Sequence, residues 1–167
     1  MKKRIINLMI VIIIMLSSCG KISDNKTPDQ QALEVQNQIM ECFVNEDKET
    51  IKTLFSEDII QKNDIDSQIE DAFEYIDSEI ISYDEPKTGE TGNIEKKDYG
   101  ARTTNIITKN GTKYCIGFKG WYSYNEIPEK VGVYCIAVYN ETLEDSLSKE
   151  QKNDESNYSV IIGSWEK

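Results

Sequence analysis

The sequence predicts an α+β fold in which helices come first and cover one face of an antiparallel sheet. Apolar residues recur at helical spacing as far as Ile76, whereas β-branched and aromatic residues alternate after Ser78. The pair Asn110-Gly111 is the strongest short hairpin signal that a sequence offers, because both central residues of a type I′ turn need positive φ. Helices followed by a run of antiparallel strands are typical of this fold class.

The first helix is predicted from Thr27, with Pro28 at the first helical position and Gln30 at the third. This arrangement matches a capping box, in which the threonine and glutamine side chains each satisfy a backbone N–H group. One face of the helix then carries apolar residues at helical spacing, namely Ala32, Val35, Ile39, Cys42 and Phe43.

Two more helices are predicted before the sheet, which makes three in all. Asn45-Glu46-Asp47 interrupts the first helical pattern and can cap a shorter helix, whose apolar side is Ile51, Leu54 and Phe55. Asn63-Asp64 can cap the third helix. Its apolar positions are Ile65, Ile69, Ala72, Phe73 and Ile76.

Five strands are predicted after these helices. They span 78–83, 101–109, 112–124, 131–140 and 158–165, and a loop that contains Pro86, Gly89 and Gly92 spans 85–97. Residues 141–157 are highly charged and nearly free of large apolar side chains. They indicate a solvated excursion or a frayed helix between the last two strands.

The N-terminus has the order of an export signal, with a basic start, an apolar run over 5–16 and small residues before Cys19. A membrane-spanning helix is the alternative, but a span takes roughly 20 apolar residues and this run is far shorter. Leu16-Ser17-Ser18-Cys19 resembles the lipobox of bacterial lipoproteins, in which a diacylglyceryl group is attached to the cysteine sulfur before cleavage. The resemblance implies that residues 1–18 are a signal peptide and that Cys19 is the lipidation site.

Lipidation predicts where the protein works. Two acyl chains give stable anchoring, so we expect an extracytoplasmic protein that is held by Cys19 on the outer face of the cell membrane. Residues 19–28 are then the lipidated N-terminus and tether, and residues 29–167 form a single domain. The alternative is a secretory signal without lipid and with a chance cysteine.

Charge and composition exclude several classes of function. The chain has 19 Lys and Arg residues against 30 Asp and Glu residues, and removal of the signal leaves 16 against 30, a net charge of −14. Such a surface repels phosphate backbones, so nucleic acid is not an expected partner. The absence of histidine excludes Ser-His-Asp and Cys-His nucleophilic sites.

No metal or cofactor is expected. Histidine, the commonest metal ligand, is missing, and the cysteines have no CxxC spacing that would suit zinc. Asp64, Asp66 and Glu70 lack the turn-forming glycine and the additional oxygen ligands of a calcium loop, and helix capping explains them better.

The segment from Phe43 to Ser56 resembles the opening of the nuclear transport factor 2-like superfamily, also described as cystatin-like. The segments Lys113 to Phe118 and Gly132 to Ile136 are similar to one branch of it, a domain-of-unknown-function family of Gram-positive lipoproteins. The resemblance spans residues 29–165. It implies a cone, with three helices on a strongly curved antiparallel sheet and a cavity between them. Some members use a carboxylate and a tyrosine there for proton transfer, but function does not follow from fold.

Two groups of residues are candidate ligand-binding sites. Asp98, Tyr99 and Arg102 form the first, because Arg102 is the only arginine after signal cleavage and arginine suits bidentate binding of a carboxylate or phosphate. A strand-edge salt bridge between Asp98 and Arg102 is the simpler alternative. Trp121 and Tyr124 form the second, as an aromatic rim, with ordinary packing as the alternative. Strand alternation places Tyr122 in the core.

Cys115 and Cys135 fall in neighbouring strands of one hairpin. If the turn between them centres near Asn125, they face each other. If it centres two residues later, they are offset by four positions, roughly 13 Å along the strand and beyond disulfide reach. We favour two buried thiols.

Two functions are consistent with these features. The first is a non-catalytic accessory module that binds a small molecule, a peptide or an envelope protein. The second is a pocket enzyme of the isomerase or dehydratase type, with an Asp or Glu base and a Tyr donor, which requires a carboxylate of raised pKa in an apolar cavity. Homodimerisation through the exposed sheet face is compatible with either.

Overall fold

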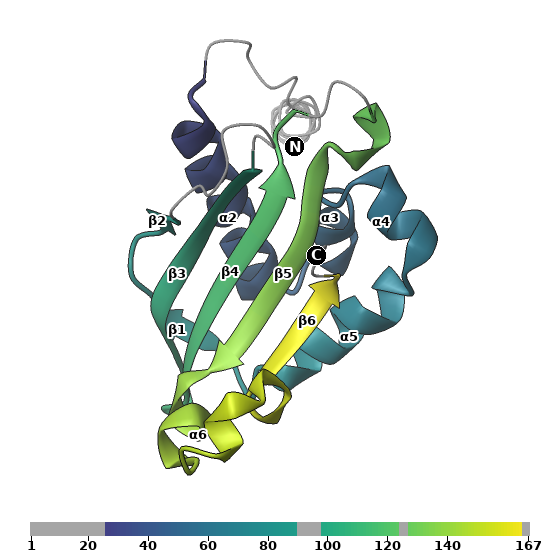
Figure 1. The fold of residues 1–167 in the computed structure, drawn as a ribbon. Coiled ribbons are helices and arrows are strands. Elements are labelled where there is room, and N and C mark those ends of the chain that lie inside the picture. Colours follow the sequence, from purple (N-terminus) through teal and green to yellow (C-terminus); the bar gives the residue numbers. More distant parts are fainter. Residues whose placement is uncertain (1–25, 90–97, 124–126, 165–167) are drawn as a thin grey trace, which may run out of the picture.

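A computed structural model describes residues 26–89, 98–123 and 127–164 (Figure 1). The predicted signal peptide, the lipidation site Cys19 and the candidate Tyr124 lie outside the described residues. Within the described ranges the chain is a mixed α+β structure, with helices followed by an antiparallel sheet. No helix in these ranges is both long enough and apolar enough to cross a membrane.

The helical region begins as predicted. Helix α2 (Pro28–Asn45) starts at a capping box in which Thr27 Oγ1 accepts a hydrogen bond from Gln30 N at 3.2 Å, and Gln30 Oε1 accepts one from Thr27 N at 3.0 Å. The helix ends at Glu46, whose left-handed backbone lets its N–H group bond to the Cys42 carbonyl. Short helix α3 (Lys48–Lys52) follows, capped by Asp47.

The prediction of three helices is wrong, because the described chain has a further one before the sheet. Helix α4 (Glu57–Lys62) lies between α3 and α5 (Ile65–Tyr75), and its formation is favoured by acidic residues in its first turn and by an ion pair between Asp58 and Lys62. Ile59 is its only fully buried residue. A single buried position gives no apolar period, so the helix leaves no pattern in the sequence.

The sheet has six strands, all antiparallel, in the order β1-β3-β4-β5-β6, and β2 pairs with β3. The strands are β1 (Ile80–Ser82), β2 (Lys87–Thr88), β3 (Asp98–Thr108), β4 (Lys113–Trp121), β5 (Gly132–Asn140) and β6 (Ser159–Gly163). Strand β2 falls within the predicted loop 85–97, and β3 begins three residues earlier than predicted. Two residues are too few to show the alternation that marks a strand.

The β3–β4 hairpin is confirmed, but its turn is not the predicted type I′. Gly111 N donates to Thr108 O at 2.9 Å, so Lys109 and Asn110 are the central residues of the turn. Gly111 has a φ of +84°, whereas Asn110 is not among the residues of positive φ. The glycine therefore supplies the left-handed residue that follows the turn in a longer hairpin loop.

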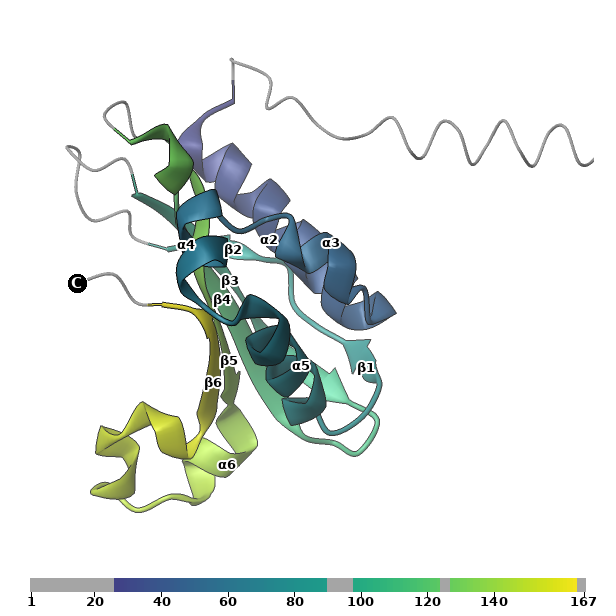
Figure 2. The same ribbon diagram turned by 90° about the vertical axis from the view of Figure 1, so that its right-hand side faces the viewer.

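The helices that precede the sheet cover only one of its faces. Figure 2 shows α2, α3 and α5 on one side, and the segment that contains α6 (Glu141–Ser146) on the other. Two short 3₁₀ helices, Gln151–Asn153 and Glu155–Asn157, complete this segment, so the predicted solvated excursion of residues 141–157 contains three helical turns. We call residues 141–157 the excursion. The face opposite the helices is called the open face.

The core lies between the helices and the sheet. Ile39, Ile106, Tyr114, Ile116 and Ile136 are at most 1% exposed. Gln36 is also fully buried, and its Nε2 donates to Thr103 Oγ1 at 3.1 Å and to the Ile116 carbonyl at 3.0 Å, which ties α2 to the two central strands.

Candidate functional site

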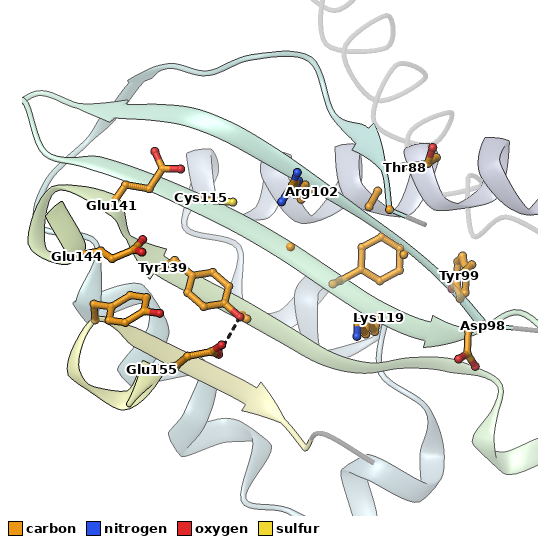
Figure 3. Close-up of a pocket in the computed structure, with 17 residues that line it drawn as sticks. Thr88, Asp98, Tyr99, Arg102, Cys115, Lys119, Tyr139, Glu141, Glu144 and Glu155 are labelled. Atoms are coloured by element: carbon orange, nitrogen blue, oxygen red, sulfur yellow. Dashed lines mark hydrogen bonds between the residues drawn. The ribbon is translucent and has the colours of Figure 1, made fainter. Parts of the chain in front are cut away.

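A trough of about 840 Å³ lies on the open face of the sheet, between the strands and the excursion (Figure 3). The strands contribute alternate residues to it, because side chains of a strand point to opposite faces in turn. Its floor consists of small residues, Gly117 of β4 and Ala137 of β5, which face each other across the sheet. The resemblance implied a cavity between helices and sheet, but this hollow lies on the opposite face.

Pairing across the sheet places longer side chains on both sides of this floor. Arg102 of β3 is opposite Gly117, so it stands at one end of the floor formed by Gly117 and Ala137. Lys119 is opposite Cys135 on one side of the floor, and Cys115 is opposite Tyr139 on the other. The small residues therefore leave a groove across the strands, bounded by these two rows.

The excursion makes one end of the trough acidic. Glu141, Glu144 and Glu155 line this end, and the Tyr139 hydroxyl group donates to Glu155 Oε2 at 3.4 Å. Figure 3 shows Glu141, Glu144 and Glu155 arranged around Tyr139. Glu141 is paired with Lys113, at 3.3 Å between Nζ and Oε2.

Two tyrosines stand beside these carboxylates. The rings of Tyr139 and Tyr158 have centroids 6.2 Å apart and are tilted by 40°. Burial raises the pKa of Tyr139 well above its usual value, and the nearby charge of Glu155 raises it further. Burial also raises the pKa of Tyr158, with the charges of Glu144 and Glu155 adding to the effect. The charge of Glu155 therefore acts on both tyrosines, and that of Glu144 acts on Tyr158.

The middle of the trough is basic. Arg102 is exposed, and it takes part in none of the ion pairs between described residues, most of which tie a lysine to a carboxylate elsewhere on the surface. Lys119 lies on the neighbouring strand two residue pairs along, since Gly100 faces Lys119 and Arg102 faces Gly117. Such diagonal neighbours are roughly 7 to 8 Å apart at Cα, within common reach of two long side chains.

The two thiols of the trough region are free and protonated at neutral pH. Cys115 and Cys135 are offset by four positions in the β4–β5 pairing, so the offset alternative is correct and no disulfide forms between them. Burial raises the pKa of Cys115 to about 11 and that of Cys135 to about 12. Neither thiol is therefore an activated nucleophile.

The structure separates the first predicted cluster. Asp98 and Arg102 share a face of β3, but they are four residues apart, which is roughly 13 Å along the strand, too far for the proposed salt bridge. Tyr99 points to the other face, where it is 7% exposed and packs edge-on against Phe118. All three residues nevertheless line the trough, with Asp98 at its far end and Arg102 at its middle (Figure 3).

Of the predicted aromatic rim, the structure describes Trp121 and not Tyr124. Trp121 is 6% exposed and packs against Tyr134 in the core, which favours the packing alternative. Tyr122, predicted to be core, is half-buried and packs against the core, where it contacts Tyr99 edge-on. The β4–β5 pairing has a β-bulge here, since Lys119 pairs with Cys135 and Gly120 with Val133, and the extra residue is Tyr134 of β5, which contacts Trp121.

Most of the trough was missed by sequence reasoning. Glu144 and Glu155 lie in a segment predicted only as solvated, and Gly117, Ala137 and Tyr139 were not singled out. A usable signal existed for the strand residues, since small residues at alternate positions of β4 and β5 indicate a sheet face that does not pack against a large side chain. The excursion gave no signal, because nothing in its charge pattern shows that it folds back over the sheet.

Three carboxyl groups of the described part of the chain have a clearly shifted pKa. The carboxyl groups with a shifted pKa there are Asp47, Asp77 and Asp154, and in each case hydrogen bonds lower the pKa. Burial raises the pKa of Asp77 in part, but the hydrogen bonds outweigh it. Among the described residues no group of three or more Cys, Asp or Glu side chains is arranged to hold a metal ion.

Comparison with known proteins gives one relationship. The family described as a domain of unknown function (DUF5104) matches residues 38–141, which run from α2 through all of β5. No curated protein matches the chain.

Proposed function

The chain belongs to a family of domains of unknown function, DUF5104, and we propose from its own geometry that it is a non-catalytic binding module whose ligand occupies the trough on the open face of the sheet. The observation that carries this proposal is the trough itself, with its floor of Gly117 and Ala137 and its charged sides. Concave sites with a few convergent polar groups are the usual places for small ligands.

The chemistry of the site supports binding over catalysis. Cys115 and Cys135 keep their protons at neutral pH, and a nucleophile has to lose its proton before it attacks. Tyr139 is a weaker acid than an ordinary tyrosine, so it transfers a proton less readily. The isomerase or dehydratase alternative would place its base in an apolar interior, and no Asp or Glu is among the buried residues of the described chain.

We further propose that the module is lipid-anchored on the outer face of the cell membrane through Cys19, with the nuclear transport factor 2-like cone as its fold and Gram-positive lipoproteins as its relatives. The lipobox-like Leu16-Ser17-Ser18-Cys19 supports the anchor. Helices on one face of an antiparallel sheet support the fold. The occupant of the trough is then a small molecule, a peptide or a segment of an envelope protein.

A trough-filling variant tests the binding function. The purified protein is screened by thermal shift against amino acids, short peptides, sugars, nucleotides and fatty acids, alongside Gly117→Leu and the control Ser82→Leu. A Cβ on Gly117 would approach Arg102 Cβ at 3.3 Å, which demands a small adjustment only, and the leucine would then fill the groove. Ser82 is exposed on β1 and does not line the trough.

The proposal predicts that at least one compound raises the Tm of the wild type and of Ser82→Leu but leaves Gly117→Leu unchanged. If a compound stabilises all three equally, it binds elsewhere and the trough is not the site. Turnover of a carbonyl substrate by the wild type would replace the binding function with the enzymatic one.

Membrane fractionation tests the anchor separately. The wild-type protein is expected in the membrane fraction and Cys19→Ala in the soluble or secreted fraction. Retention of Cys19→Ala in the membrane contradicts lipid anchoring at this residue.

A further inference from the structure

The trough carries opposite charges at separate places. This polarity limits the chemical class of ligand that can bind there. Glu144 and Glu155 stand with Tyr139 and Tyr158 at the excursion end, while Arg102 stands over the middle of the floor (Figure 3). Each group is suited to one kind of charge. Two carboxylates beside two aromatic faces favour a cation, and an exposed guanidinium favours a carboxylate.

The basic side is not neutralised from within the described chain. Arg102 has no ion-pair partner among the described residues, although the chain has an excess of acidic residues, 30 against 19. Asp98, the nearest carboxylate on its own face of β3, is four residues away and out of reach. The guanidinium is therefore open to an anion that enters the trough.

Two carboxylates on the acidic side take part in no ion pair between described residues. Glu141 is paired with Lys113, whereas Glu144 and Glu155 appear in no such pair. Glu155 accepts a hydrogen bond from the Tyr139 hydroxyl group, and this bond holds the carboxylate at the trough wall. This end is consequently held in place by the excursion and keeps a negative charge available.

The register of the sheet gives the spacing between the two ends. Arg102 and Tyr139 lie two strands apart and two residue pairs apart along the strands, which corresponds to roughly 12 Å between Cα atoms. Their side chains extend into the trough, so the gap between the charged groups is shorter than this. A ligand that spans it needs several bonds between its two charges.

We propose that the trough binds a zwitterion of the short-peptide type, with its carboxylate on Arg102 and its cationic group between Glu144, Glu155 and the rings of Tyr139 and Tyr158. This inference rests on the proposed binding function and adds the chemical class of the ligand. Lys119, the diagonal neighbour of Arg102, adds positive potential at the carboxylate end.

Four simple compounds test the polarity. The probe 6-aminohexanoate has both charges separated by five methylene groups, hexanoate and hexylamine each keep one of the charges, and glycine has both charges on a short spacer. Binding to the purified protein is measured by calorimetry at low and at physiological salt. The zwitterion 6-aminohexanoate is expected to bind about tenfold or more tightly than each of the other three, because a hydrogen bond to a charged group contributes roughly this factor.

Charge-removing variants identify the two ends. Arg102→Gln should weaken 6-aminohexanoate about tenfold and leave hexylamine unchanged, whereas Glu144→Gln and Glu155→Gln should weaken 6-aminohexanoate and leave hexanoate unchanged. Lys109→Gln and Glu79→Gln are matched controls, because this exposed pair makes the same charge changes outside the trough. Neither control should alter binding.

Two results would overturn the inference. If hexylamine binds as tightly as 6-aminohexanoate and Arg102→Gln has no effect, the site takes a cation alone. If none of the four compounds binds while another compound of the thermal-shift panel binds in a Gly117-dependent manner, the zwitterion is wrong and the binding function remains. If no compound binds in either experiment, both the zwitterion inference and the proposed binding function are wrong.

Discussion

The hydroxyl group of Tyr139 donates a hydrogen bond to Oε2 of Glu155 at 3.4 Å. This bond joins β5 to the last part of the excursion, sixteen residues further along the chain. Tyr139 also packs against Tyr158, the residue that leads into β6. These contacts fix the acidic wall of the trough to its floor, so the site is built by one short segment that folds back over the strand it has just left.

Tyr139→Phe should change the response of the protein to alkaline pH. Burial raises the pKa of Tyr139 above its unfolded value of about 10, so its stabilising effect is complete below pH 10 and is lost as the pH rises through the folded pKa. We expect the wild-type free energy of unfolding to fall above about pH 10. The free energy of unfolding of Tyr139→Phe should fall less steeply with pH.

Urea unfolding at pH 8, 9, 10 and 11 measures this effect. Tyr83→Phe is the control, since Tyr83 is exposed on the surface. Equal alkaline slopes for wild type, Tyr139→Phe and Tyr83→Phe would show that the buried phenol does not govern alkaline stability.

Asp77→Ala should destabilise the β3–β4 hairpin. The Asp77 carboxylate accepts a hydrogen bond from Thr108 Oγ1 at 2.7 Å, and the Thr112 hydroxyl and the Asn110 amide also donate to it. These bonds hold the hairpin tip to the end of α5. Because Asp77 is exposed, we expect a loss of only about 1 to 2 kcal/mol, measured by urea unfolding at pH 7.

The same carboxylate predicts an acid dependence. Hydrogen bonds keep the pKa of Asp77 below its usual value despite partial burial, so its stabilisation is present above the unfolded pKa of about 3.9 and is lost as the pH falls through the lower folded value. The loss caused by Asp77→Ala should therefore shrink below about pH 4. Asp71→Ala, an exposed change on α5, should show neither effect.

Gln36→Ala should be among the more damaging substitutions in α2. It removes the two hydrogen bonds to Thr103 and the Ile116 carbonyl and leaves a cavity in a fully buried place, at a cost of roughly 2 to 4 kcal/mol. Gln36→Leu keeps the volume and should cost less than about 1.5 kcal/mol. Gln38→Ala, an exposed change on the same helix, is the control. An equal cost for all three would mean that Gln36 does not anchor the helix.

Native alkylation should find Cys115 slow to react. Burial raises its pKa to about 11, and the charge of Glu141 contributes, so the thiolate fraction at pH 8 is only about one in a thousand. The alkylation rate should rise about tenfold per pH unit from pH 7 to 10. Peptide mapping by mass spectrometry follows Cys115 apart from the other cysteines. A rate that levels off near pH 8.5 would mean that its pKa is not raised.

The first and last parts of the fold differ in how far the sequence predicts them. The first helix was predicted from Thr27 through Phe43 because its cap and its apolar face are both local. The hairpin was predicted from Asn110-Gly111, and its position is right although only Gly111 of this pair has positive φ. Helix α4 and strand β2 were not predicted, because neither is long enough to show a periodic pattern of apolar residues.

The candidate site was harder to predict because it depends on register. A β-bulge adds Tyr134 to β5 opposite Lys119 and Gly120, and Trp121 packs against this residue. Alternation from the sequence alone cannot include such a bulge. Arg102 was selected for its chemistry and does line the trough, whereas Glu144 and Glu155 reach it only through the fold of the excursion. The sequence therefore predicts the chemistry of a single side chain, but it does not predict which other side chains lie beside it in the fold.

The central claim is that ligand binds on the open face of the sheet and not among the helices. Amide NMR of the purified protein during titration with 6-aminohexanoate tests it most directly. We predict that the shifted amides are those of Arg102, Gly117, Ala137 and Tyr139 and of the excursion, and that those of α2 and α5 stay in place. Shifts confined to the helices, with the open face unchanged, would contradict the account.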